Sequence, residues 1–165
     1  MKVFDIILTG INVILATTSA FGAWKSIKYY QKSKNLSIYT QINKSLIEIQ
    51  KMLIKLPEVL SASNQSLRGK RGMNLQNTLC GIGQALNNSL MTIGADIPVE
   101  CSNDLKKLQN DGDFELQKYI NSLINGEAVK ENSIDFNDYD LCQERLNEIQ
   151  EYLKRKSSDI GEELK

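Results

Sequence analysis

Apolar residues follow two patterns along this chain, one nearly continuous and one periodic. From Val3 to Trp24 they form an almost unbroken run, VFDIILTGINVILATTSAFGAW, in which Asp5 is the only charged residue. Its 22 residues would extend about 33 Å as an α-helix, and a hydrocarbon core is about 30 Å thick. The run therefore predicts a transmembrane helix, which we assign to residues 1–24.

Three other interpretations of this run stay open. A secretory signal peptide would carry a more basic start and a better cleavage site than Thr18-Ser19-Ala20. A helix in the core of a soluble domain would accommodate the polar residues within the run. A helix lying in the membrane interface would need a strongly charged face, which the run lacks. The length and the flanks favour the transmembrane helix.

Small and polar residues within the run fall on one face of the predicted helix, at alternating steps of four and three. We expect five of them to form a membrane association face: Thr9, Asn12, Ala16, Ser19 and Ala23. Such side chains let membrane helices approach one another, and an interhelical hydrogen bond contributes about 1 kcal/mol. In the alternative interpretation, the hydroxyl groups bond back to their own helix and the face contacts lipid.

A basic segment, residues 25–35, follows the apolar run directly. It contains Lys25, Lys28, Lys32 and Lys34, next to the interfacial aromatic residue Trp24. Basic residues flanking a membrane helix remain on the cytoplasmic side. The pattern thus predicts a single-pass membrane protein whose C-terminal domain is cytoplasmic and whose four lysines contact lipid headgroups.

The periodic pattern begins beyond this segment and predicts a helical bundle domain over residues 36–165. Its clearest part has apolar residues at alternating steps of three and four: Tyr39, Ile42, Leu46, Ile49, Leu53, Leu56 and Leu60. This spacing also fits a coiled coil, but the apolar face is wider than a coiled-coil seam, which favours a bundle core. Pro57 is expected to end or kink the helix.

Further helices follow at shorter intervals. After a connection at residues 61–72, we expect helices near residues 74–93, 103–110, 113–126 and 138–156, and then a frayed tail. Gly81 and Gly83 either weaken their helix or let a neighbour approach. The predicted fold class is therefore all-α, an N-terminal transmembrane helix followed by a small cytosolic bundle of about four to five helices.

Charge divides the chain, although its formal net charge is zero. Residues 25–72 contain ten Lys or Arg and two Glu, a net charge of +8, whereas residues 73–165 carry −8. The basic half is attracted by anionic lipid headgroups, and the acidic half either lies away from the bilayer or folds back on the basic half. A nucleic-acid-binding domain would need a basic excess, so we do not expect nucleic acid as a partner.

The residue types give little support for catalysis. The chain has no histidine, which removes histidine-based nucleophilic catalysis and His-ligated zinc. Its cysteines, Cys80, Cys101 and Cys142, are too widely spaced for a common metal site and suit reduced thiols. We therefore expect no enzyme activity, no cofactor, no metal and no small-molecule substrate.

The sequence from Leu67 to Leu75, LRGKRGMNL, holds a basic loop with Arg68, Lys70 and Arg71, in which two glycines flank the pair Lys70-Arg71. It resembles the GXXG loop of KH-type RNA-binding domains, which clamps a nucleic-acid backbone. That family also needs a three-stranded sheet, for which the sequence shows no convincing strands. Contact of this loop with anionic lipid, or with solvent only, is the preferred interpretation.

These patterns predict a membrane-anchored scaffold, adaptor or regulatory protein. Its expected partners are the lipid membrane and either another protein or a second copy, bound through helices. The alternative is a small membrane-acting effector, such as a toxin or defence protein, whose span oligomerises to perturb the bilayer.

Overall fold

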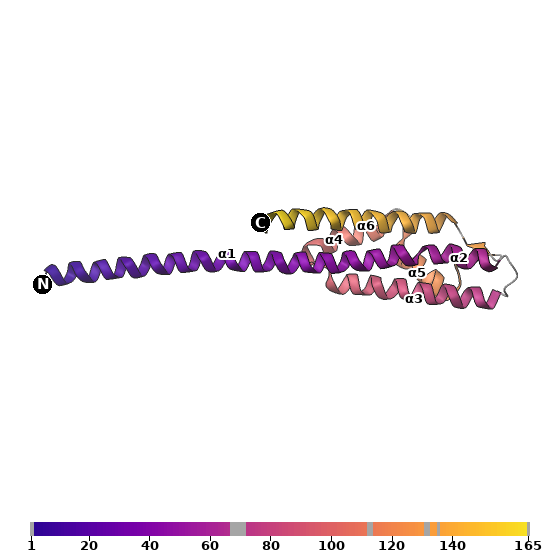
Figure 1. The fold of residues 1–165 in the computed structure, drawn as a ribbon, viewed down its shortest axis with the longest axis horizontal. Helices are drawn as coiled ribbons and strands as arrows, with labels where there is room; N and C mark the ends of the chain where they lie inside the picture. Colours follow the sequence, from indigo (N-terminus) through magenta and orange to yellow (C-terminus); the bar gives the residue numbers. More distant parts are fainter. Residues whose placement is uncertain (1, 67–71, 112–113, 131–132, 135, 165) are drawn as a thin grey trace.

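The computed structural model describes residues 2–66, 72–111, 114–130, 133–134 and 136–164. A single helix, α1 (Lys2–Lys55), contains 54 residues and runs along most of the long axis of the molecule (Figure 1). It joins three segments that the sequence divides, namely the apolar run, the basic segment and the first periodic helix. The helix is continuous because no proline occurs before Pro57.

Pro57 ends α1, as predicted, and begins α2 (Pro57–Ser66). Proline suits the first position of a helix because the backbone N–H that it lacks has no partner there. The amide of Leu56 still donates to the carbonyl of Met52 at 2.8 Å, so the interruption between the two helices is confined to Leu56.

The second half of α1 is the centre of a helical bundle. Two long helices, α3 (Gly72–Asp96) and α6 (Phe136–Glu163), run beside it in the opposite direction (Figure 1). The shorter α5 (Leu116–Asn125) packs on α3, and α4 (Val99–Gln109) packs on α6. The prediction of an all-α bundle is confirmed.

Among the described residues, one small hairpin lies between α4 and α5 and another between α5 and α6, and the sequence analysis missed both. Strands β1 (Asn110–Asp111) and β2 (Phe114–Glu115) pair antiparallel before α5. After α5, β3 (Val129–Lys130) pairs with β4 (Ser133–Ile134) in the same way. Strands this short carry no alternating apolar pattern from which they could be recognised.

The core lies between α1, α3, α5 and α6. Ile42, Ile49 and Met52 of α1 are fully buried, and so are Leu56, between α1 and α2, and Val59 of α2. The buried face of α1 is therefore wider than a coiled-coil seam, which confirms the prediction of a bundle core. Other fully buried large side chains of this core include Leu79, Leu86, Ile93, Leu116, Ile120, Leu123, Leu146, Ile149 and Leu153.

The frayed tail predicted after residue 156 is wrong, because α6 continues as a helix to Glu163. Packing against α1 holds this last part in place. Ser157 is 8% exposed, and its hydroxyl donates to Oδ1 of Asn43 at 3.1 Å. Ile160 also packs against the core. Similarly, α4 begins at Val99, directly after Pro98, and so starts earlier than the predicted residue 103.

The first half of α1 projects beyond the bundle (Figure 1). Its large apolar side chains Val13, Ile14, Leu15 and Phe21 are 56–64% exposed, so these residues do not belong to the bundle core. Across the residues that the structure describes, no helix offers a segment long and apolar enough to cross a bilayer. The structure therefore does not support the predicted span. The side chains of residues 2–9 and 11, which belong to the predicted span, lie outside the described ones.

Candidate functional site

The exit segment, which we define as residues 24–35, is the part of α1 that leaves the bundle. It contains all four lysines of the predicted basic segment. The C-terminal end of α6 lies beside α1 in this region (Figure 1). Two segments far apart in the sequence thus meet at the base of the projecting half-helix.

Two polar contacts tie the exit segment to the bundle. Nζ of Lys34 lies 3.0 Å from Oε1 of Glu100 in the first turn of α4. Nδ2 of Asn35 donates to Oε2 of Glu163 at 2.9 Å. The hydrogen bond and charge of Glu100 raise the pKa of Lys34 above its usual value. The pKa of Glu100 is lowered, first by a hydrogen bond from its own backbone amide and then by Lys34.

Lys34 therefore differs from the other three lysines of the segment. Lys25, Lys28 and Lys32 are exposed, and the described residues include no carboxylate that pairs with any of them. Of the four lysines predicted to contact lipid headgroups, Lys34 thus forms an ion pair with Glu100 of α4. The other three have no such partner among the described residues.

An open groove of about 690 Å³ lies between the exit segment and the end of α6. Its lining residues are Trp24, Lys25, Lys28, Tyr29, Gln31, Lys32, Asn35, Glu163 and Leu164. The sequence analysis singled out the lysines, but it missed Asn35, Glu163 and Leu164 as their neighbours. The opposite net charges of residues 25–72 and 73–165 were the one signal in the sequence that could have indicated that the exit segment and the end of α6 lie side by side.

Aromatic rings accompany the lysines at the start of the exit segment. Nζ of Lys25 lies 5.3 Å from the ring centroid of Phe21, and Nζ of Lys28 lies 5.1 Å from that of Trp24. The two rings are 6.0 Å apart, centroid to centroid. Cations over aromatic faces are attracted by the ring quadrupole. Tryptophan and lysine in this arrangement are typical of the boundary between membrane and water.

The predicted association face lies on the projecting half of α1. Asn12, Ala16, Ser19 and Ala23 are exposed there, while the side chain of Thr9 lies outside the described ones. The neighbouring Thr17 and Thr18 show the back-bonding that the alternative interpretation expects. The hydroxyl of Thr17 donates to the carbonyl of Val13 at 3.0 Å, and that of Thr18 to Ile14 at 2.8 Å.

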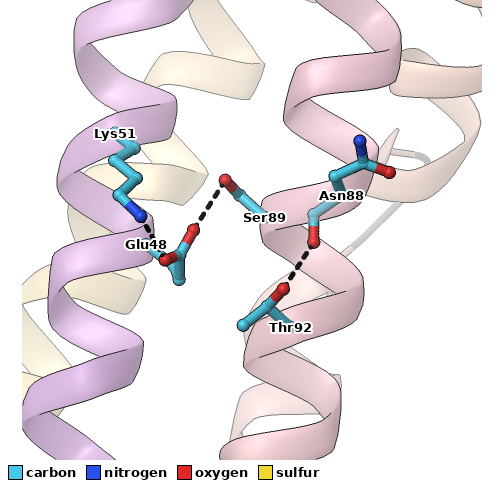
Figure 2. Close-up of polar contacts among 5 residues, drawn as sticks. All are labelled: Glu48, Lys51, Asn88, Ser89 and Thr92. Atoms are coloured by element: carbon cyan, nitrogen blue, oxygen red, sulfur yellow. Dashed lines mark hydrogen bonds and ion pairs between the residues drawn. The ribbon is translucent and has the colours of Figure 1, made fainter.

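A second polar cluster lies between α1 and α3 within the bundle (Figure 2). Oε1 of Glu48 lies 2.6 Å from Nζ of Lys51, and the hydroxyl of Ser89 donates to Oε2 of Glu48 at 2.9 Å. The hydrogen bond from Lys51 is the main cause that lowers the pKa of Glu48, and Ser89 adds to it. The carboxylate thus joins the two helices.

The remaining candidate residues, those of the KH-like loop and the cysteines, form no site among the residues that the structure describes. Arg68, Lys70 and Arg71 of the KH-like loop lie outside the described residues. The strands that the structure describes form two-stranded sheets, whereas the KH family needs three strands. Cys101 and Cys142 are buried free thiols, and burial raises the pKa of Cys142 to about 12. The described residues contain no group of side chains suited to a metal ion.

Comparison with known proteins places the chain in no established group, because no family model, curated protein or solved structure matches it.

Proposed function

We propose that this protein is a membrane-anchored helical scaffold or adaptor. The first half of α1 enters the bilayer, and the bundle is held at the cytoplasmic surface. One contrast within a single helix carries this proposal. Val13, Ile14, Leu15 and Phe21 are more than half exposed, whereas apolar residues of the bundle half, such as Ile42, are fully buried.

Transfer into lipid would give these exposed side chains the apolar environment that the described bundle does not provide. Fully burying a side chain of this size contributes about 1.5–3 kcal/mol. The back-bonded hydroxyls of Thr17 and Thr18 would enter lipid with their hydrogen-bond donors already satisfied. Asn12 would lie near the middle of the bilayer and would need a polar partner there.

The exit segment supports the same placement. Trp24 and the cationic side chains of Lys25 and Lys28 would lie at headgroup level, where amphipathic rings and lysines are favoured. A basic segment retained in the cytoplasm would place the bundle there. Because the chain has no histidine, we propose protein binding rather than catalysis as the role of the bundle.

Fluorescence of Trp24 tests the anchor, because it is the only tryptophan in the chain. The full chain is mixed with phosphatidylcholine vesicles whose acyl chains carry bromine either near the carbonyl end or near the methyl end. We expect strong quenching by the shallow bromine and weak quenching by the deep one. No quenching by either lipid, with full access of aqueous iodide to Trp24, would contradict the proposal.

Matched variants distinguish insertion of the first half of α1 into the bilayer from nonspecific binding through exposed apolar side chains. Ile14→Lys with Leu15→Lys should abolish quenching, since each lysine at the centre of a span costs about 3 kcal/mol. Ile47→Lys with Ile54→Lys changes equally exposed residues of the bundle half and should leave quenching intact.

The exposed polar face around Asn12 favours one second candidate, the membrane-acting effector. Vesicles loaded with a fluorescent dye distinguish the two functions. A passive anchor leaves the dye inside, whereas release that is lost in Asn12→Leu would support the effector.

A further inference from the structure

We propose that the groove at the exit segment binds the phosphate group of an anionic phospholipid headgroup, held by Lys25, Lys28 and Lys32. This inference rests on the proposed function, because the groove reaches headgroups only when the preceding part of α1 lies in the bilayer. It goes further by assigning a discrete site and the class of ligand.

The three lysines lie on one side of α1, because their spacings of three and four residues correspond to successive helical turns. All three line the same groove of about 690 Å³. They carry no ion pair within the described residues, whereas Lys34 of the same segment is paired with Glu100 at 3.0 Å. The lysines of the exit segment that have no ion-pair partner among the described residues therefore all line this groove.

A phosphate group is the ligand that this chemistry fits. An ammonium group offers three hydrogen-bond donors and a compact charge, and lysine is a common phosphate binder. Lys25 and Lys28 lie over the rings of Phe21 and Trp24, which limits the positions of their charges without neutralising them. Trp24 also lines the groove, and its indole would suit the glycerol backbone of the lipid.

The opposite wall sets the charge of the preferred ligand. Glu163 from the end of α6 lines the groove, and Asn35 holds its carboxylate at 2.9 Å. One carboxylate opposite three ammonium groups lowers the positive excess but does not cancel it. The site should therefore favour an anionic headgroup, such as that of phosphatidylglycerol, over zwitterionic phosphatidylcholine.

The emission of Trp24 reports directly on this groove. The full chain is reconstituted in phosphatidylcholine bilayers that contain increasing amounts of phosphatidylglycerol. We expect a saturable change in emission for the wild type. Replacing Lys25, Lys28 or Lys32 with Gln should weaken the apparent affinity by about fivefold per lysine. Glu163→Gln should strengthen it, by up to about fivefold.

Two controls match these variants in net charge. The single variants Lys44→Gln, Lys106→Gln and Lys107→Gln each remove one exposed lysine outside the groove and should keep the wild-type response. Glu162→Gln neutralises the neighbour of Glu163, which does not line the groove, and should change the affinity less than Glu163→Gln does. Equal effects of groove and control variants would overturn the site in favour of general surface charge.

A further measurement distinguishes binding of the lipid headgroup from binding of free phosphate. Inorganic phosphate added to phosphatidylcholine bilayers should not reproduce the change in emission, and an equal response to it would overturn the lipid assignment. Bromine quenching in the same samples reports insertion. Quenching without any response to phosphatidylglycerol contradicts the headgroup site alone, whereas loss of quenching contradicts the proposed anchor.

Discussion

At Gly83 the helices α3 and α5 approach so closely that a methyl group would not fit. A Cβ atom at this position would lie 2.8 Å from Cγ1 of Ile124 and 3.1 Å from the backbone nitrogen of Ile124. At Gly81, two residues earlier in α3, a Cβ atom would meet nothing within 4 Å. From the sequence, each of the two glycines could either weaken its helix or let a neighbouring helix approach. In the structure, the neighbouring helix approaches at Gly83.

This difference predicts opposite effects of the same substitution. Gly83→Ala should lower the free energy of unfolding by about 1–2 kcal/mol, because overpacking outweighs the gain in helix propensity. Gly81→Ala should raise it by about 0.5–1 kcal/mol, since only the propensity changes. Denaturant unfolding followed by circular dichroism measures both. If Gly83→Ala also stabilises the protein, the described contact between α3 and α5 is wrong.

Among the elements, the pairing of α1 with α3 depends partly on one carboxylate. The side chain of Glu48 is only 17% exposed, and it binds both Lys51 of its own helix and Ser89 of α3 (Figure 2). These contacts lower its pKa below the ordinary value of 4.5 in the folded state. Glu58, which pairs with Lys55 at 2.7 Å, is more exposed and serves as a comparison.

The lowered pKa makes this contact sensitive to pH. The stabilisation is present above the unfolded pKa near 4.5 and is lost as the pH falls through the lower folded pKa. Glu48→Gln should therefore cost about 1 kcal/mol near neutral pH, and the difference from wild type should shrink below about pH 4.5. Glu58→Gln should cost less than about 0.5 kcal/mol. A cost of Glu48→Gln that is constant from pH 7 to about pH 3 would contradict this assignment.

At the scale of the whole molecule, one continuous helix connects two different environments. The bundle half of α1 is packed between α3 and α6, whereas the other half projects away from them (Figure 1). The exit segment between them is solvent-exposed, and the contact of Asn35 with Glu163 is one of its ties to the bundle. Helical hydrogen bonds exposed to water open more readily than those in a packed core.

Hydrogen exchange should therefore show a minimum of protection within α1. For the protein in vesicles, we expect slow exchange in residues 12–22 and 40–54, and faster exchange in residues 25–33. Asn35→Ala should accelerate exchange in the exit segment by roughly threefold. Thr40→Ala is the control, because the hydroxyl of Thr40 donates to the carbonyl of Leu36 in its own helix. Uniform protection along α1 would contradict this division.

Local patterns predicted much of the helical architecture. The steps of three and four correctly marked Ile42 and Ile49 of α1, and Leu56 directly after it, as core residues. Pro57 ends α1 as expected, and Gly126 ends α5 in a left-handed conformation at a φ of 77°. These features depend on residues within a turn or two, so the sequence contains the information directly. The short hairpins and the helical end of α6 lack such a local signal.

The candidate site was predicted only in part. The sequence by itself determined the apolar run, the basic segment after it and the charge division, because each is a property of neighbouring residues. Tertiary structure alone decided that Lys34 pairs with Glu100, and that Glu163 lines the same groove as Lys25, Lys28 and Lys32. The contact between Asn35 and Glu163 joins residues 128 positions apart. Packing of α6 along α1 creates it, and no local pattern specifies which residues of two long helices lie side by side.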